Sequence, residues 1–145
     1  MMLTDDKGEK CWEKSTYCKY NEISQKKVFL IGNIDPKLSL KEKHEAGKKA
    51  VSEVIKKQAR WIGLGGGHDF GYPDGAGFLL ANKDSQKKPL IINFDAHYDL
   101  RPLLPNQQGS SGTPFRQIAE DRKAKNKPFD YLCIGIQETA NTQAL

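Results

Sequence analysis

The sequence contains few cysteines and no long hydrophobic run, and both absences exclude classes of protein. Its three cysteines, Cys11, Cys18 and Cys133, lack a Cys-x2-Cys spacing. No apolar leader of the secretory kind is present, so we expect reduced thiols in a cytoplasmic protein and no disulfide framework. No stretch approaches the roughly 18 apolar residues of a membrane span, and mean hydropathy is -0.68. The sequence therefore predicts no membrane partner.

A block of like charge is also absent. Lysine and arginine number 23 against 18 acidic residues, giving a net charge of +5, but the lysines are scattered as short pairs such as Lys26-Lys27 and Lys87-Lys88. A nucleic-acid-binding surface usually needs a clustered basic stripe, so we expect a solvated basic surface and no nucleic-acid partner. The 145 residues suit one domain or part of one.

The order of apolar runs predicts an α/β fold. Residues 1–27 are polar without clear periodicity and are expected to form an irregular arm, whereas 28–145 are expected to form an α/β domain. Ser39 and Glu42 have the spacing of a capping box, and apolar residues follow at helical intervals to about Lys57. Apolar runs between helical segments are typical of a parallel sheet. We predict strands at 28–32, 61–64, 89–95 and 130–137, and helices at 40–57, at 76–82 and from Pro114.

Charged side chains follow the third predicted strand directly. In an extended segment Asp95, His97 and Asp99 would share one face, because side chains alternate along a strand. His68 follows the preceding predicted strand, at 61–64. Because the carboxyl ends of parallel strands meet at one edge of a sheet, His68 is expected to lie near the other three residues. Two carboxylates and two imidazoles suit Mn²⁺, with Zn²⁺, Fe²⁺, Co²⁺ and Ni²⁺ as chemical competitors. Alternatively, His68 is an ordinary loop residue, and Asp95, His97 and Asp99 bind no metal ion.

Two other kinds of site fit the sequence less well: a phosphate-binding glycine loop and a nucleophilic cysteine. The glycine run at 63–67 has neither the Gly-Lys-Ser/Thr of a phosphate-binding loop nor the last glycine of the dinucleotide pattern. Cys133 lies inside an apolar strand, so core packing is the expected role rather than nucleophilic catalysis.

Four segments carry a family resemblance: "GLGGGHDFGY", "NFDAHYDLRP", "SSGTPFRQI" and "GIQETANTQAL". In this order they resemble the ureohydrolase (arginase and agmatinase) superfamily, most closely its formimidoylglutamase branch. The resemblance covers 28–145 and implies a three-layer α/β/α parallel sheet of the arginase/deacetylase type, here with only part of its strands. It also implies a small-molecule substrate and leaves a homo-oligomer open.

The resemblance further implies a site with two Mn²⁺ ions that share a bridging hydroxide. His68, Asp95 and Asp99 would hold one ion, and His97 with a bridging Asp95 would hold the other. No side chain is otherwise assigned a catalytic role. Hydroxide formed between two cations can attack a planar amidine carbon, so the implied reaction is hydrolysis of a formimino or guanidino C–N bond.

The branch within the superfamily depends on smaller features. Ser111 occupies a position where arginases and agmatinases carry a histidine, and "DLRP" follows the metal triplet, as in formimidoylglutamases. The implied reaction is N-formimidoyl-L-glutamate and water to L-glutamate and formamide. Arg101 could pair with a substrate carboxylate or form a loop salt bridge. Ser110, Ser111 and Thr113 could bind substrate or cap the helix that begins near Pro114.

Part of the family pattern is absent. The later half of family members carries an Asp-x-Asp segment that completes both metal sites, and no acidic residue after Leu100 has that pattern. In the family's sheet, strands from that half also lie between the strand before His68 and the strand before Asp95. We therefore predict a fragment of a ureohydrolase, with a truncated gene product and a degenerate paralogue as alternatives. An agmatinase- or arginase-like enzyme, and an inactive metal-binding or interaction fragment, remain alternatives.

Overall fold

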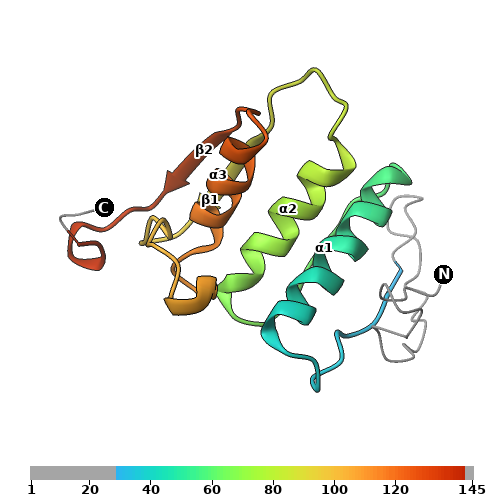
Figure 1. The fold of residues 1–145 in the computed structure, drawn as a ribbon, viewed down its shortest axis with the longest axis horizontal. Coiled ribbons are helices and arrows are strands. Elements are labelled where there is room, and N and C mark those ends of the chain that lie inside the picture. Colours follow the sequence, from blue (N-terminus) through green and yellow to red (C-terminus); the bar gives the residue numbers. More distant parts are fainter. Residues whose placement is uncertain (1–28, 143–145) are drawn as a thin grey trace. The chain divides into compact units, whose positions relative to one another are not determined.

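The computed structural model describes residues 29–142, so the predicted arm at 1–27 lies outside the described residues. The chain divides into two compact units between Ala46 and Gly47, and the candidate site belongs to the second. The helices and strands of the described residues follow the predicted alternation (Figure 1). They are α1 (Leu40–Lys56), α2 (Gly71–Ala81), β1 (Leu90–Phe94), α3 (Pro114–Ala124) and β2 (Asp130–Ile134). Short 3-10 helices occupy His68–Phe70, Pro105–Gln107 and Glu138–Ala140.

The first helix begins where the capping box predicts. The Ser39 backbone N–H donates to Glu42 Oε2 at 2.8 Å, and the Glu42 N–H donates to Ser39 Oγ at 3.4 Å. These bonds satisfy two of the backbone donors that the first turn of a helix leaves without intrahelical partners. The predicted helix at 40–57 is therefore confirmed, with its end one residue earlier.

Two parallel strands carry the site. Leu90 pairs with Asp130 and Phe94 with Ile134, and the pairing continues past the strand ends because Asp95 N–H donates to Ile134 O at 3.0 Å. Both strands begin after a proline-containing loop and are rich in aliphatic residues, as the prediction requires. The parallel sheet and the strands at 89–95 and 130–137 are confirmed, each somewhat shorter than predicted.

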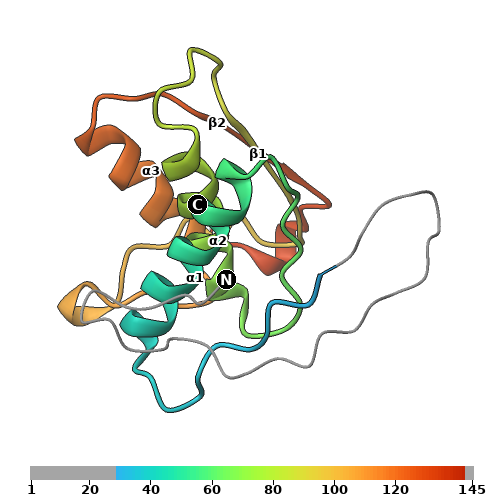
Figure 2. The ribbon, with the colours of Figure 1, turned by 90° about the vertical axis from the view of Figure 1, so that its right-hand side faces the viewer.

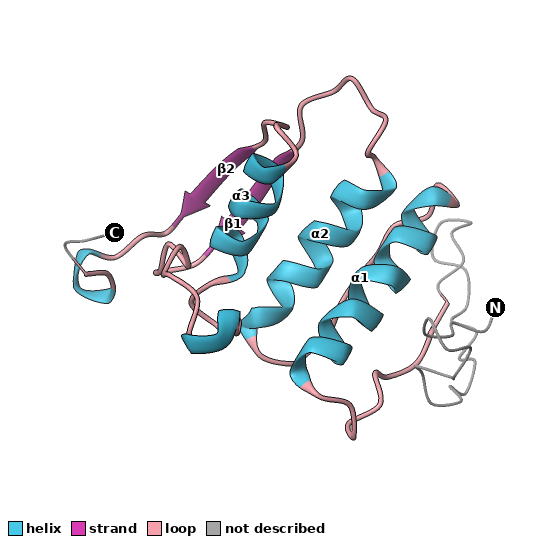
Figure 3. Ribbon diagram, in the orientation of Figure 1, coloured by secondary structure: helices cyan, strands magenta, loops and turns pink. Residues whose placement is uncertain are grey.

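Helices α2 and α3 pack side by side over one face of this sheet (Figures 2 and 3). Leu79, Phe115 and Ile118 form the buried core between them, and Ile91 and Tyr131 pack against it from the sheet. Helix α3 begins at Pro114, a residue favoured in the first turn because it has no N–H to satisfy. Helix α2 begins at Gly71, five residues before the predicted start.

The opposite face of the sheet is apolar and exposed. It consists of alternate residues of the two strands, all between 42% and 77% exposed: Leu90, Ile92, Phe94, Leu132 and Ile134. Apolar residues on both faces are the pattern of a sheet covered on both sides. The α/β class is confirmed, and within 29–142 only two of the three expected layers are present.

Two predicted strands are wrong. The segment 29–32 is not a strand, and Phe29 is 68% exposed; Val28 lies outside the described residues. The segment 61–64 is also not a strand, and Leu64 is 90% exposed. Neither segment pairs with the β1–β2 sheet. An apolar run becomes a strand only when a neighbouring edge satisfies its backbone donors and acceptors, and neither segment is paired with an edge of β1 or β2.

No helix among residues 29–142 has the length and apolar character needed to cross a membrane.

Replacing Gly77 by alanine is expected to destabilise the protein by about 1–3 kcal/mol, the usual cost of overpacking. An added Cβ would lie 2.6 Å from the Lys48 carbonyl oxygen and 2.6 Å from Val51 Cβ, so α2 would have to move away from the C-terminal half of α1. Urea unfolding followed by circular dichroism measures the change. Gly71→Ala is the control, because its Cβ would meet ordinary contacts at 3.4 Å or more. Equal stability of Gly77→Ala and the wild type would contradict this helix contact.

The carboxyl of Asp74 in α2 should make stability pH-dependent. Trp61 Nε1 donates to Asp74 Oδ1 at 3.0 Å, but burial dominates and raises the pKa of Asp74 above 3.8. The folded state therefore binds this proton at a higher pH than the unfolded state does. Above the folded-state pKa the buried carboxylate is charged and lowers the free energy of unfolding by its full amount, and below pH 3.8 the carboxyl is neutral in both states and this destabilisation disappears. We expect Asp74→Asn to be more stable than the wild type at pH 7 and equally stable near pH 3. Urea midpoints across this range measure the difference, and a constant difference at all pH values would contradict the assignment.

Candidate metal centre

The loop after β1 turns sharply instead of continuing as a strand. Strand β1 ends at Phe94, residues 95–97 form bends, and Asp99 has a positive φ of 52°. Aspartate adopts this left-handed conformation more readily than most residues. The predicted alternation of Asp95, His97 and Asp99 on one strand face is therefore wrong, because the strand ends before the first of them.

The turn nevertheless brings both carboxylates to His68. His68 Nε2 lies 2.9 Å from Asp99 Oδ2 and 3.8 Å from Asp95 Oδ2. One donor atom from each of the three residues lies within 4.8 Å of the others. Two carboxylate oxygens and one imidazole nitrogen at this separation form a donor set that a divalent cation fits.

The glycine loop places His68. Gly65 and Gly66 have positive φ values of 78° and 79°, a conformation that side-chain-bearing residues rarely adopt. A Cβ on Gly66 would also lie 3.0 Å from the Phe70 ring. The chain then enters the 3-10 helix at His68. The glycines therefore turn the backbone so that His68 faces the loop after β1.

His97 lies on the other side of Asp95. Its Nδ1 lies 2.9 Å from Asp95 Oδ1, and its backbone N–H donates to the same oxygen at 2.9 Å. Asp95 thus offers Oδ1 to His97 and Oδ2 to His68, the division of oxygens that a carboxylate between two cations would need. His97 contacts Asp95 but does not join the cluster of His68, Asp95 and Asp99.

The two carboxylates differ in environment. The backbone hydrogen bond from His97 is the main cause that lowers the pKa of Asp95, and the His97 side chain lowers it further. Burial is the main cause that raises the pKa of Asp99, whose side chain is only 7% exposed. His68 opposes that shift, while the charge of Asp95 adds to it.

The predicted substrate residues lie on two adjoining loops. The Arg101 N–H donates to Gly112 O at 3.0 Å, which joins the loop of Arg101 to that of Ser110, Ser111 and Thr113. Thr113 is 1% exposed, and its hydroxyl accepts from the Ser110 N–H at 2.8 Å and lies 3.1 Å from Gln117 Oε1. Thr113 therefore stabilises the loop through its hydrogen bonds to Ser110 and Gln117. Arg101 and Ser111, in contrast, are exposed.

Sequence reasoning missed three residues beneath the cluster. Asn93 is buried in β1 and its Nδ2 donates to Asp99 Oδ2 at 3.4 Å and to the Tyr131 hydroxyl at 3.2 Å. Phe115 stacks on Tyr131 with ring centroids 4.7 Å apart and meets the His68 ring edge-on at 5.9 Å. The available signal was Asn93 itself, a polar residue inside the apolar run "LIINF".

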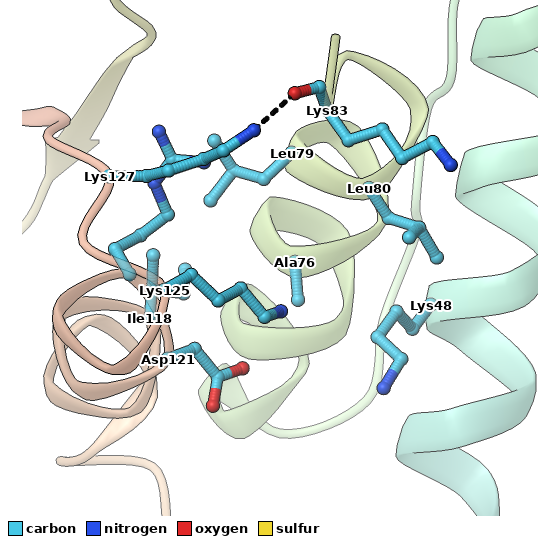
Figure 4. Close-up of a pocket in the computed structure, with 10 residues that line it drawn as sticks. Lys48, Ala76, Leu79, Leu80, Lys83, Ile118, Asp121, Lys125 and Lys127 are labelled. Carbon is cyan, nitrogen blue, oxygen red and sulfur yellow. Dashed lines mark hydrogen bonds between the residues drawn. The ribbon is translucent and has the colours of Figure 1, made fainter.

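A separate pocket of about 400 Å³ lies between α2 and α3 and extends to Lys48 of α1 (Figure 4). Apolar residues such as Ala76, Leu79 and Ile118 line it together with five cationic side chains. None of the predicted site residues contributes to this pocket. The candidate metal centre is therefore the loop cluster at the carboxyl end of β1, within an α/β fold.

The comparisons agree with this fold. The Arginase family matches residues 7–145, so the chain belongs to the Arginase family. It is 41% identical over 116 residues to a formimidoylglutamase of Salmonella newport (strain SL254), covering 79% of this chain and 36% of the relative. A formimidoylglutamase of Clostridium tetani is 40% identical over 122 residues, covering 82% of this chain and 36% of the relative. The chain thus spans about a third of the length of these relatives.

A solved structure is also similar. The crystal structure of Trypanosoma cruzi formiminoglutamase with Mn²⁺ matches at a TM-score of 0.59 and 33% identity, covering 70% of this chain and 32% of that chain. The resemblance to ureohydrolases inferred from the four sequence segments is confirmed. The structural match extends that agreement to the arrangement of the helices and the parallel strands.

Proposed function

We propose that this chain is part of a manganese-dependent hydrolase that converts N-formimidoyl-L-glutamate and water to L-glutamate and formamide. The observation that carries the proposal is the cluster of His68, Asp95 and Asp99, with the second oxygen of Asp95 directed at His97. The formimidoylglutamase relatives support the substrate, and the related structure with Mn²⁺ supports the metal.

The proposed ligands divide between two ions. His68, Asp95 and Asp99 would hold one Mn²⁺, and His97 with the other oxygen of Asp95 would hold the second. When bound, the pair of ions lowers the pKa of a shared water so that hydroxide is present near neutral pH. The described residues supply at most three side chains to either ion, so we place the remaining ligands outside residues 29–142.

The chain's own residues would also orient the substrate. The exposed guanidinium of Arg101 offers two parallel donors to a carboxylate, and N-formimidoyl-L-glutamate carries two carboxylates. Ser110 and Ser111 would add hydroxyl groups from the adjoining loop. In the balanced reaction water adds to the formimino carbon, the bond from that carbon to the glutamate nitrogen breaks, and the nitrogen takes up a proton.

Complementation tests this function. The chain would be co-expressed with the remaining two-thirds of the Salmonella relative, loaded with Mn²⁺ and incubated with N-formimidoyl-L-glutamate, arginine or agmatine. We expect formamide from the first substrate, no urea from the other two, and no formamide when Asp95→Ala replaces the wild-type chain. Urea release would show that the assigned branch is wrong, and turnover by Asp95→Ala would show that this cluster is not the catalytic centre.

The incomplete donor set favours a second candidate, a metal-binding module without turnover. In that case Mn²⁺ would raise the melting temperature of the 145-residue chain, because a ligand that binds only the folded state stabilises it. No formamide would be released even after complementation. The two candidates therefore predict the same stabilisation by Mn²⁺ and differ in the product assay.

A further inference from the structure

We propose that Asn93 is a positioning residue of the metal centre: its side-chain amide holds the carboxylate of Asp99 toward the position that the cation would occupy. The inference rests on the proposed function, because it assumes that Asp99 binds Mn²⁺. Asn93 itself lies in β1 beneath the cluster and is not one of the proposed ligands.

The burial of Asn93 calls for polar partners. Asn93 is 6% exposed and occupies the face of β1 that packs toward the helices, where its neighbour on the same face is Ile91. A buried amide costs free energy unless it is hydrogen-bonded, and an aliphatic side chain would carry no such cost at this position. The Nδ2 group has two protons, and its two closest acceptors are the Tyr131 hydroxyl at 3.2 Å and Asp99 Oδ2 at 3.4 Å.

The same amide also fixes the backbone of the turn. The Tyr131 hydroxyl accepts from Asn93 and donates its own proton to the Tyr98 carbonyl at 2.8 Å. Asn93 therefore contacts Asp99 directly and is linked to Tyr98, the residue before it, through one hydroxyl group. Asp99 requires this support because its backbone has a positive φ of 52°.

The network extends to the third member of the cluster. Tyr131 stacks on Phe115, and Phe115 meets the ring of His68 edge-on. The orientation of Asp99 and the ring of His68 are thus both supported by side chains that bind no metal. Such outer partners hold ligands in place before the cation arrives, and their loss typically costs 10–100-fold in metal affinity.

An amide is suited to this role for a chemical reason. It donates to Asp99 without carrying charge, so the full negative charge of the carboxylate remains available to a cation. A lysine at this position would compete with the cation, and a carboxylate would repel Asp99.

Mn²⁺ affinity of the 145-residue chain tests the inference. We expect Asn93→Leu, which has a similar size and no donor, to bind Mn²⁺ about 10–100-fold more weakly than the wild type in isothermal titration calorimetry. Val51→Ala is the control, because it removes a buried side chain of α1 and should lower the melting temperature without changing Mn²⁺ affinity. Tyr131→Phe keeps the stacked ring and should show a smaller loss, which provides a second variant if Asn93→Leu does not fold.

Two further readouts separate positioning from stability. Water-proton relaxation should show more water on the Mn²⁺ bound to Asn93→Leu, because a water replaces the displaced Asp99 oxygen. On an Asp99→Ala background, Asn93→Leu should have no additional effect on affinity. Equal affinity of Asn93→Leu and the wild type, or an additive effect in the double variant, would overturn this inference and leave the proposed function standing. Absence of Mn²⁺ binding by the wild-type chain, both alone and together with the remaining two-thirds of the Salmonella relative, would overturn both.

Discussion

Replacing Asp95 by asparagine is expected to weaken Mn²⁺ binding by more than about 100-fold, because loss of an outer partner already costs 10–100-fold. Asp95 is the residue that faces both imidazoles, with Oδ1 2.9 Å from His97 Nδ1 and Oδ2 3.8 Å from His68 Nε2. Asparagine keeps the size of the side chain but removes the charge and one oxygen. Isothermal titration with Mn²⁺ measures the loss.

The stability of the metal-free protein should change little in this variant. Asp95 lies in a solvent-accessible loop, and exposed ion pairs contribute at most about 1 kcal/mol. Asp121→Asn is the matched control, because it removes the same charge from an exposed residue of α3 outside the cluster. If Asp121→Asn weakened binding as much as Asp95→Asn, the affinity would reflect net charge, and the cluster would not be the binding site.

The elements that the sequence predicted correctly are those with local signals. Helix α1 has a capping box and helical spacing, and α3 has a proline at its start. Strands β1 and β2 are short apolar runs that pair with each other. The run at 61–64 has a similar composition but is not a strand, because a strand also needs an edge to pair with, and that edge is not encoded in the run itself.

The candidate site likewise has features that the local sequence predicts and features that depend on distant residues. The convergence of His68, Asp95 and Asp99 agrees with the prediction, but only part of its reason is right: Asp95 and Asp99 follow strand β1, whereas His68 follows a segment that is not a strand and is placed by the turn at Gly65 and Gly66. The geometry within the cluster could not be predicted by alternation, since the turn at Asp99 depends on a positive φ and on support from Asn93 and Tyr131. Those two residues lie 38 positions apart in the chain and meet only through the strand pairing.

Replacing Phe115 by alanine is expected to reduce the free energy of unfolding by about 3–5 kcal/mol, the usual cost of a large-to-small change in a core. Phe115 is 5% exposed in the core between α3 and the sheet, and it also supports the rings of Tyr131 and His68. Since small domains are stable by only about 5–15 kcal/mol, the variant should unfold at a much lower urea concentration. Circular dichroism in a urea series measures the shift.

The metal centre should be affected by the same change even where the variant remains folded. Without Phe115 the His68 ring loses its edge-on contact and Tyr131 loses its stacking partner, so both supports of the cluster weaken together. Phe115→Leu is the control. Leucine fills part of the cavity, so the stability of this variant should lie between that of the wild type and that of Phe115→Ala. If the free energy of unfolding of Phe115→Ala fell by less than about 1 kcal/mol, the change would be too small for the truncation of a buried aromatic side chain. Helix α3 would then not pack on the sheet, and the support proposed for Asp99 and His68 would lose its physical basis.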